Sequence, residues 1–245
     1  NLAAINSINW GRVAAQIVYY FTSFELLGEE KVSFSVPTGN FGDILAGWVA
    51  KKMGLPISQL IVATNENDIL NRAILSGDYS LGKVHATISP SMDIQISSNF
   101  ERMLFEAYNR DSREISSLMN ELVSNRGFTI KDSALNFIKN DFISNKASEE
   151  DTKKTIRKFY KEENIIIDPH TAVGLFAANE VGLNETSIIS LGTAHPAKFP
   201  EAVFDALNVY PEIPKKLEEC LKGEEKFATM DKDPNFLKEY IKENL

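Results

Sequence analysis

The sequence has almost no cysteine and no long apolar run, and each absence excludes a class of protein. Cys220 is the only cysteine among 245 residues, so an intrachain disulfide framework or a cysteine metal cluster is excluded. We expect an inert thiol and a reducing, cytoplasmic compartment. No apolar run reaches the roughly 18 residues that a membrane span needs. No signal peptide is visible either, so we expect no membrane partner.

Basic residues are in the minority. The chain has 26 Lys and Arg against 34 Asp and Glu, a formal net charge of −8. This balance argues against nucleic acid as a partner, because phosphate backbones are bound by Lys and Arg. Hydrophobic residues make up 43% of the chain, which is enough for a sizeable core in one large domain or two small ones.

The first part of the chain predicts a βαβ unit. Apolar residues follow helical spacing over about 8–27, and a short β-rich run covers 31–36. A helix is expected from Asp43 to Met53, closed by Gly54, and the next strand covers 59–63. Because the connections are short, we expect an α/β fold with a parallel sheet.

The second part predicts mostly helices. We interpret about 108–162 as a helical, insertion-like region, in which Glu149, Glu150 and Asp151 begin a helix rather than bind a ligand. Further segments are expected as a helix at 171–181, a buried strand at 187–191 and helices from Pro200 onward.

A glycine-containing turn links the first predicted strand to the next helix. It reads Pro37-Thr38-Gly39-Asn40-Phe41-Gly42-Asp43. Glycines let backbone N–H groups approach an anion closely, and the helix adds the positive end of its dipole, so the turn is a candidate phosphate cradle. The alternative is an ordinary strand-to-helix turn. Neither a Walker A loop nor G-x-G-x-x-G is present. We expect Asp43 to be the helix N-cap, with its carboxylate facing away from the phosphate.

The turn and the residues after it, Pro-Thr-Gly-Asn-Phe-Gly-Asp-Ile-Leu-Ala-Gly, resemble the phosphate loop of threonine synthases, which are pyridoxal-phosphate (PLP) enzymes. Six further blocks resemble the family in the same order. They include Asn-Ser-Ile-Asn-Trp, Asp-Pro-His-Thr-Ala-Val-Gly and Gly-Thr-Ala-His-Pro-Ala-Lys-Phe, and they cover 6–12, 63–70, 87–94, 97–102, 168–174 and 192–199. The middle of the chain and its tail carry little specific signal.

The resemblance implies the C-terminal, large PLP-binding portion of a two-domain enzyme with a three-layer fold of the tryptophan-synthase-β type. It implies the conversion of O-phospho-L-homoserine and water into L-threonine and phosphate, with PLP as the electron sink. Two alternatives stay open. One is a threonine-synthase-like phospholyase that does not make threonine. The other is a non-catalytic module that binds another anion or a partner.

Site residues follow from the same resemblance. The backbone of Gly39, Asn40, Phe41 and Gly42 should hold the cofactor phosphate, with Asp43 closing the loop. The Thr193 hydroxyl should lie near the pyridine nitrogen; the alternative is a hydroxyl that satisfies local backbone. Candidates for the substrate's phosphate or carboxylate are Asn6, Ser7, Asn9 and Arg12, since an Arg fork suits such groups. Arg12 could equally be a surface charge on a helix.

A PLP enzyme needs a Schiff-base lysine, and the resemblance does not supply one in this chain. Lys198 matches a family lysine that does not have this role, and the family's Schiff-base lysine lies upstream of the position of Asn1. We therefore assign no catalytic residue here and expect an absent N-terminal, lysine-bearing portion as the partner of this chain. The start at Asn1, without Met, fits a cut through a longer protein. We expect the chain alone to be inactive.

Other polar and aromatic residues have structural explanations. We expect His170 and His195 to be packed and hydrogen-bonded rather than metal ligands, and no metal site. Trp10 and Trp48 are expected in the core. Asn65 and Asn67 follow a strand and either line the cleft or form a turn.

Overall fold

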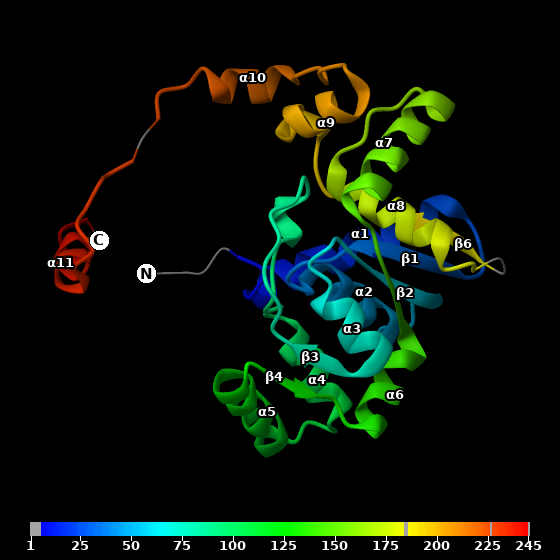
Figure 1. The fold of residues 1–245 in the computed structure, drawn as a ribbon, viewed down its shortest axis with the longest axis vertical. Coiled ribbons are helices and arrows are strands. Elements are labelled where there is room, and N and C mark those ends of the chain that lie inside the picture. The colour runs from blue at the N-terminus through cyan, green and yellow to red at the C-terminus, as the bar shows by residue number, and fades with distance from the viewer. Residues whose placement is uncertain (1–5, 184–185, 226, 245) are drawn as a thin grey trace. The chain divides into compact units, whose positions relative to one another are not determined.

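A four-stranded parallel sheet organises the larger part of the chain (Figure 1). Its strands are β1 (Val32–Pro37), β2 (Ile57–Thr64), β5 (Phe142–Lys146) and β6 (Ser187–Ser190), in the order β5-β2-β1-β6. The helix α2 (Gly42–Lys52) connects β1 to β2, which confirms the predicted βαβ unit. The helix closes as expected, because Gly54 follows its C-cap with a positive φ of 107°.

The computed structural model describes residues 6–183, 186–225 and 227–244, so Asn1 lies outside the described residues. The described residues form two units, one within 6–211 and the other made of 212–225 and 227–244. The second unit contains α10 (Lys215–Leu221) and α11 (Pro234–Asn244), and Cys220 is exposed there. The first unit contains the other elements: α1 (Trp10–Leu27), α3 (Ile69–Ser76), β3 (Asp78–Ser80), η1 (Pro90–Met92), α4 (Phe100–Ala107), α5 (Ser112–Asn125), β4 (Gly127–Thr129), α6 (Asp132–Asp141), α7 (Glu149–Glu163), α8 (Pro169–Glu180), η2 (Pro196–Lys198) and α9 (Pro200–Leu207).

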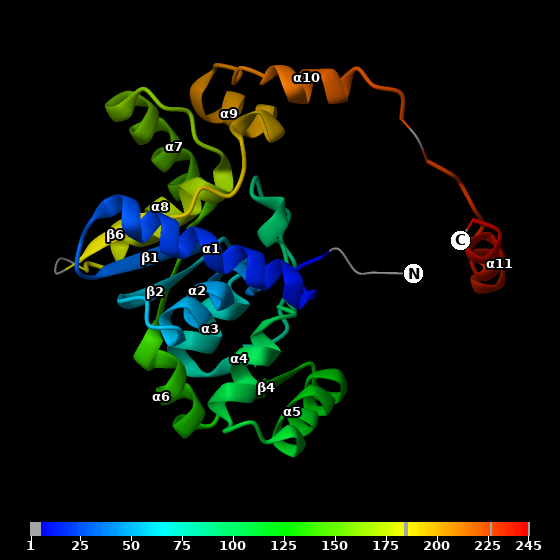
Figure 2. The same cartoon turned by 180° about the vertical axis from the view of Figure 1, so that it is seen from behind.

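Helices cover both faces of the sheet, which gives three layers. Along β2, Leu60 and Val62 point into the main core, which α1 and α2 share on one face (Figure 2). The alternate residues Ile61 and Ala63 pack against Val173 and others of α8 on the opposite face (Figure 1). Both faces of β2 are therefore apolar, as expected for a strand buried in a parallel sheet.

The region 108–162 is helical as predicted, but it is more than an insertion. It contains α5, α6 and α7, and a Ser148 capping box begins α7 at the predicted acidic run. The same region also supplies β5, which pairs with β2 at the edge of the main sheet. The sequence of β5, Phe-Ile-Ser-Asn-Lys, is too short and too polar to stand out from the helices around it.

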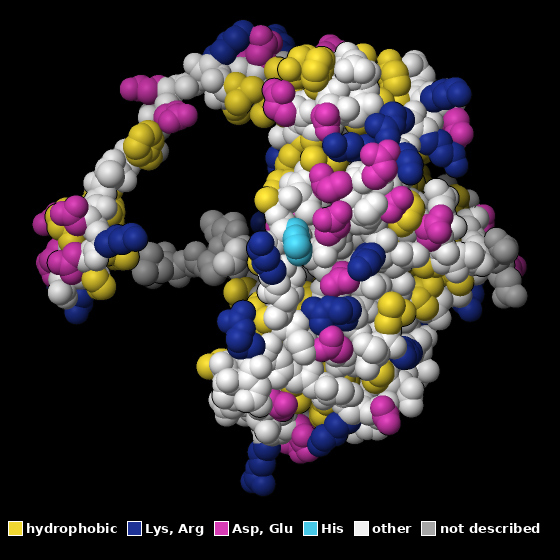
Figure 3. Space-filling model, in the orientation of Figure 1, with side chains coloured by type: hydrophobic (Ala, Val, Ile, Leu, Met, Phe, Trp, Pro, Cys, Tyr) yellow, Lys and Arg dark blue, Asp and Glu magenta, His cyan; other side chains and the backbone are white. Residues whose placement is uncertain are grey.

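Among the described residues, the charged side chains on one face of the molecule form no large patch of a single sign. On the face shown in Figure 3, basic and acidic side chains are interspersed. Trp48 is 8% exposed, as predicted, but Trp10 is 50% exposed, so its prediction as a core residue is wrong. Trp10 begins α1, and the guanidinium of Arg102 covers its ring at 5.8 Å. In the part of the chain that is described, no helix is both long enough and apolar enough to cross a bilayer.

The sheet order creates a switch point between β1 and β6. The chain runs from β1 outward through β2 to β5, and then returns to the other side of β1 as β6. The strands pair in parallel, with Ser35 opposite Ser190, so the loops that follow β1 and β6 lie side by side. In open α/β sheets, ligands bind outside the carboxyl ends of the strands at such a point.

Candidate functional site

In the loop after β1, the carbonyl groups of Gly39 and Asn40 accept hydrogen bonds, whereas the backbone N–H groups of 39–42 are free within the described part of the chain. The Ser97 hydroxyl donates to the carbonyl of Gly39 at 2.8 Å, and both N–H donors of Asn99, backbone and side chain, reach the carbonyl of Asn40 at 3.1 Å. Among the described residues, the backbone N–H groups of 39–42 donate no hydrogen bond. Consecutive free N–H groups at a helix N-terminus form an anion-binding nest.

The two glycines of the loop are required by close packing. A Cβ on Gly39 would lie 2.7 Å from the carbonyl oxygen of Ser91, and one on Gly42 would lie 3.3 Å from Nδ2 of Asn99. Neither glycine has a positive φ. Glycine is therefore required at both positions because a side chain would collide with neighbouring atoms, and not because the backbone adopts a conformation that only glycine favours.

Phe41 takes the left-handed conformation in this loop, with a φ of 60°. Such a conformation costs a bulky residue about 1–3 kcal/mol. The ring is 1% exposed and packs against Phe100 and Phe142 at centroid distances of 5.2 and 5.5 Å. Burial of a Phe side chain contributes about 1.5–3 kcal/mol, which offsets the strain. The ring thus anchors the loop to the core.

Asp43 does not cap α2, so that prediction is wrong. Phe41 occupies the N-cap position without a side-chain bond, and Asp43 lies in the first turn. Its Oδ1 accepts hydrogen bonds from the hydroxyls of Tyr19 at 2.6 Å and Tyr20 at 3.0 Å, both on α1. The expected orientation away from the phosphate stays a prediction, because Asp43 also lines the cavity beside the loop.

Burial raises the pKa of Asp43, and the two tyrosine hydroxyls oppose that rise. Burial and the nearby carboxylate raise the pKa of Tyr20 in turn. Both effects keep the tyrosine protonated as a donor. Gly47 makes room for this arrangement, since a Cβ there would lie 2.6 Å from the Tyr20 ring.

Thr193 lies just beyond β6, beside the loop. Pairing of β1 with β6 extends to Leu191, whose N–H donates to the carbonyl of Ser35 at 2.9 Å. Two residues later, the N–H of Thr193 donates to Oγ1 of Thr171 at 3.3 Å. We call the adjoining space the site cavity; its volume is about 180 Å³ and its lining includes Gly39, Asn40, Ser91, His170, Thr193 and Lys198. The structure thus brings Thr193 to the phosphate loop.

A buried histidine supports the wall of the site cavity. Nε2 of His170 accepts from the N–H of Ser91 at 3.2 Å, so Nδ1 carries the proton and donates to Asp168 at 3.0 Å. Asp168 also accepts from the hydroxyl of Thr171. Burial acts to raise the pKa of Asp168, but these hydrogen bonds outweigh it and hold the pKa below its usual range. His170 is therefore packed and hydrogen-bonded, as predicted.

His195 is hydrogen-bonded but not packed. It is exposed, and its Nδ1 accepts from the N–H of Ala197 to cap η2. In the described ranges, no group of three or more His, Cys, Asp or Glu side chains is placed to hold a metal ion.

The predicted substrate residues divide into two groups. Ser7 lines the cavity beside the loop, and its carbonyl accepts from Nδ2 of Asn99 at 2.8 Å. The side chains of Asn6 and Asn9 accept from nearby backbone N–H groups where α1 begins, and Arg12 is exposed on that helix. Their roles toward a substrate stay predictions.

Asn65 and Asn67 hold the segment that forms one wall of the cavity. Nδ2 of Asn65 donates to Asp93 at 2.8 Å, and Nδ2 of Asn67 donates to the carbonyl of His85 at 2.9 Å. Both asparagines are nearly fully buried. The N–H of Asn67 also donates to Oδ1 of Asn65 at 2.9 Å, so of the two alternatives left open by the sequence the structure supports the turn.

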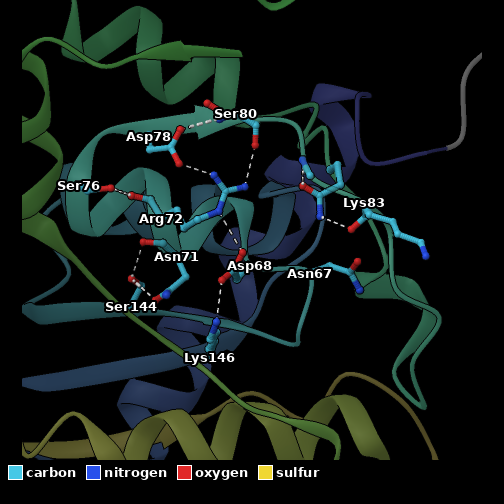
Figure 4. Close-up of polar contacts among 12 residues, drawn as sticks. Asn67, Asp68, Asn71, Arg72, Ser76, Asp78, Ser80, Lys83, Ser144 and Lys146 are labelled. Atoms are coloured by element: carbon cyan, nitrogen blue, oxygen red, sulfur yellow. Dashed lines mark hydrogen bonds and ion pairs between the residues drawn. The ribbon is translucent and has the colours of Figure 1, made fainter. Parts of the chain in front are cut away.

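An ion-pair network lies farther along the same edge (Figure 4). Asp68 accepts from Nε of Arg72 at 3.1 Å and from Nζ of Lys146 at 2.8 Å, while Nη1 of Arg72 contacts Asp78 at 2.5 Å. Hydrogen bonds from Lys146 and Arg72 outweigh the effect of burial and lower the pKa of Asp68. These charges are paired with one another, so we assign the network to structure.

Sequence reasoning missed the residues that shape the loop from outside it. Ser97 and Asn99 hold its carbonyls, and Tyr19 and Tyr20 hold Asp43. The similarity of 97–102 to a family block was a signal for the first pair. No sequence signal indicated that Tyr19 and Tyr20 contact Asp43, because both belong to a predicted helix whose apolar spacing already explained them.

Comparison with known proteins places these features in a family. The family described as "Threonine synthase, C-terminal" matches residues 171–241. The threonine synthase of Pseudomonas aeruginosa is 44% identical over 233 residues, covering 94% of this chain and 50% of that protein. The threonine synthase of Saccharomyces cerevisiae is 46% identical over 277 residues, covering 100% of this chain and 54% of that protein.

Among solved structures, PLP-bound threonine synthase from Brucella melitensis superposes with a TM-score of 0.93 at 46% identity, covering 99% of this chain and 53% of that one. The fold is therefore the three-layer α/β fold of PLP enzymes of the tryptophan-synthase-β type. More narrowly, the chain belongs to the threonine synthase family. It spans about half the length of the curated relatives it matches.

Proposed function

We propose that these residues form the large PLP-binding portion of a threonine synthase, which converts O-phospho-L-homoserine and water into L-threonine and phosphate. The observation that carries the proposal is the nest of free N–H groups at 39–42, with the carbonyls of Gly39 and Asn40 held by other residues. The nest lies at the switch point of the sheet, beside Thr193.

The residues of the site fit PLP. The free N–H groups of 39–42 would bind its phosphate, aided by the dipole of α2. The hydroxyl of Thr193 would lie at the pyridine nitrogen, where a neutral partner does not force protonation of the ring. Bound PLP supplies an electron sink for proton removal beside the substrate's amino group.

Other roles concern the substrate. The phosphate or carboxylate of the substrate would be bound by Ser7, which lines the cavity beside the loop, and by the neighbouring Asn6, Asn9 and Arg12. Arg12 would bind it through the two parallel N–H groups of its guanidinium. The Schiff-base lysine would come from the N-terminal portion of the same enzyme, outside these 245 residues. We further propose a cytoplasmic location, consistent with the single cysteine.

The test is product analysis on the full-length protein, supplied with PLP and O-phospho-L-homoserine. Inorganic phosphate and L-threonine should appear in equal amounts. Phosphate without threonine would indicate a phospholyase. If PLP does not bind and no phosphate is released, the proposal is wrong.

A further inference from the structure

The site cavity has a lysine with no acidic partner. Among the described residues, Lys198 is the only lysine or arginine that lines this cavity, and no described Asp or Glu lines it. Within the described part of the chain, no carboxylate oxygen lies within 4.0 Å of Lys198. Two other lysines near strands of the sheet are paired: Lys146 with Asp68 at 2.8 Å and Lys51 with Asp141 at 2.7 Å. Lys198 therefore lines the cavity as an exposed side chain without a counter-ion among the described residues.

The local fold explains why this lysine is placed there. The side chain of His195 and its carbonyl accept from the N–H groups of Ala197 and Lys198, which fixes the short turn η2. The ring of the next residue, Phe199, packs on His170 at 4.7 Å, and Nζ of Lys198 lies 6.0 Å from that ring. These contacts fix the backbone of the Ala-His-Pro-Ala-Lys-Phe block so that its lysine lines the cavity.

We propose that Lys198 binds an oxyanion of the small molecule in the site, as a second anion-binding element next to the N–H nest. This inference rests on the proposed function. The oxyanion is a phosphate or a carboxylate, for which a lysine ammonium is a strong point-charge donor. It belongs either to the cofactor or to the phosphorylated substrate. In both cases Lys198 acts through charge and hydrogen bonding, and forms no covalent bond.

The variant Lys198→Gln in full-length holoenzyme tests this role, with Lys198→Arg retaining the charge. Lys158→Gln, on the exposed surface of α7, is the matched control for losing one positive charge. The measurements are the dissociation constant of PLP by absorbance titration, kcat and KM for O-phospho-L-homoserine, and the thermal midpoint. A lost hydrogen bond to a charged group weakens binding by about 10- to 150-fold.

The two sources of the oxyanion give different results. If the substrate supplies it, KM rises at least tenfold in Lys198→Gln and the PLP constant stays as in the control. If the cofactor supplies it, the PLP constant rises instead. In either case Lys198→Arg restores at least part of the affinity. Values within twofold of Lys158→Gln for both constants would overturn the proposal.

A second measurement does not depend on folding of the variant. The wild-type protein is treated with an acylating reagent, with and without inorganic phosphate, and the labelled lysines are quantified by mass spectrometry. Phosphate should protect Lys198 and leave Lys158 unchanged; equal labelling of Lys198 would overturn the proposal. If the wild-type protein neither binds PLP nor turns over, the proposed function fails, yet this experiment still reports on Lys198. Trapping of PLP on Lys198 by borohydride would contradict the non-covalent role.

Discussion

Substitution of Gly39 by alanine should weaken cofactor binding and also lower the stability of the fold. The new Cβ would lie 2.7 Å from the backbone oxygen of Ser91, well inside the 3.4 Å at which ordinary contact begins. A backbone atom cannot rotate away as a flexible side chain can, so the loop or the Ser91 segment must move by several tenths of an ångström. Overpacking of this kind costs about 1–3 kcal/mol.

The same displacement turns the N–H groups of 39–42 away from a shared anion. Loss of one hydrogen bond to a charged phosphate costs about 1.5–3 kcal/mol, so the PLP dissociation constant should rise by about 10- to 150-fold. The assay is absorbance titration of full-length apoprotein, with the thermal midpoint measured in parallel. Gly82→Ala is the control, since its Cβ would be in ordinary contact at 3.4 Å. Equal PLP affinity in both variants would refute the nest as the phosphate site.

Two further predictions concern carboxylates near the sheet. Asp141 accepts from Nε1 of Trp48 at 2.9 Å and from Lys51 at 2.7 Å, so Asp141→Ala should lower the free energy of unfolding by about 2 kcal/mol in denaturant titrations. Burial acts to raise the pKa of Asp141, but the hydrogen bond from Lys51 outweighs it, so the pKa is lowered. The stability that ionised Asp141 contributes is therefore present above about pH 4 and is lost as the pH falls through the lowered pKa. A loss of stability in Asp141→Ala that does not change with pH would contradict this reasoning. Burial raises the pKa of Asp43, so its ionisation costs stability above the raised value. Asp43→Asn should therefore unfold no more easily than wild type at pH 7, with any advantage lost below about pH 4; a large destabilisation at pH 7 would show that the charge is needed.

The sequence was sufficient to predict elements with strong local signals. The βαβ unit follows from a β-rich run, a glycine turn and a helix closed by Gly54, and all of these lie where predicted. The acidic start of α7 was equally clear, because its capping box is local. By contrast, β5 was missed since its five residues are held by pairing with β2, which no local pattern reveals.

At the site, sequence and resemblance located the loop but not what shapes it. The chemistry of Gly39 depends on Ser91 and Ser97, which lie more than fifty residues away in the chain. Asp43 was assigned as a cap because it begins the predicted helix and could accept from the first-turn amides, yet Tyr19 and Tyr20 of α1 bind its carboxylate. Tertiary contacts decided both roles.

The central claim is that the N–H nest after β1 binds the phosphate of PLP. The most direct test is a crystal structure of the full-length protein with PLP. We predict that the phosphate oxygens lie within about 3.2 Å of backbone nitrogens of 39–42, with the hydroxyl of Thr193 at the pyridine nitrogen. A phosphate held elsewhere, with these N–H groups bonded to protein instead, would contradict the account.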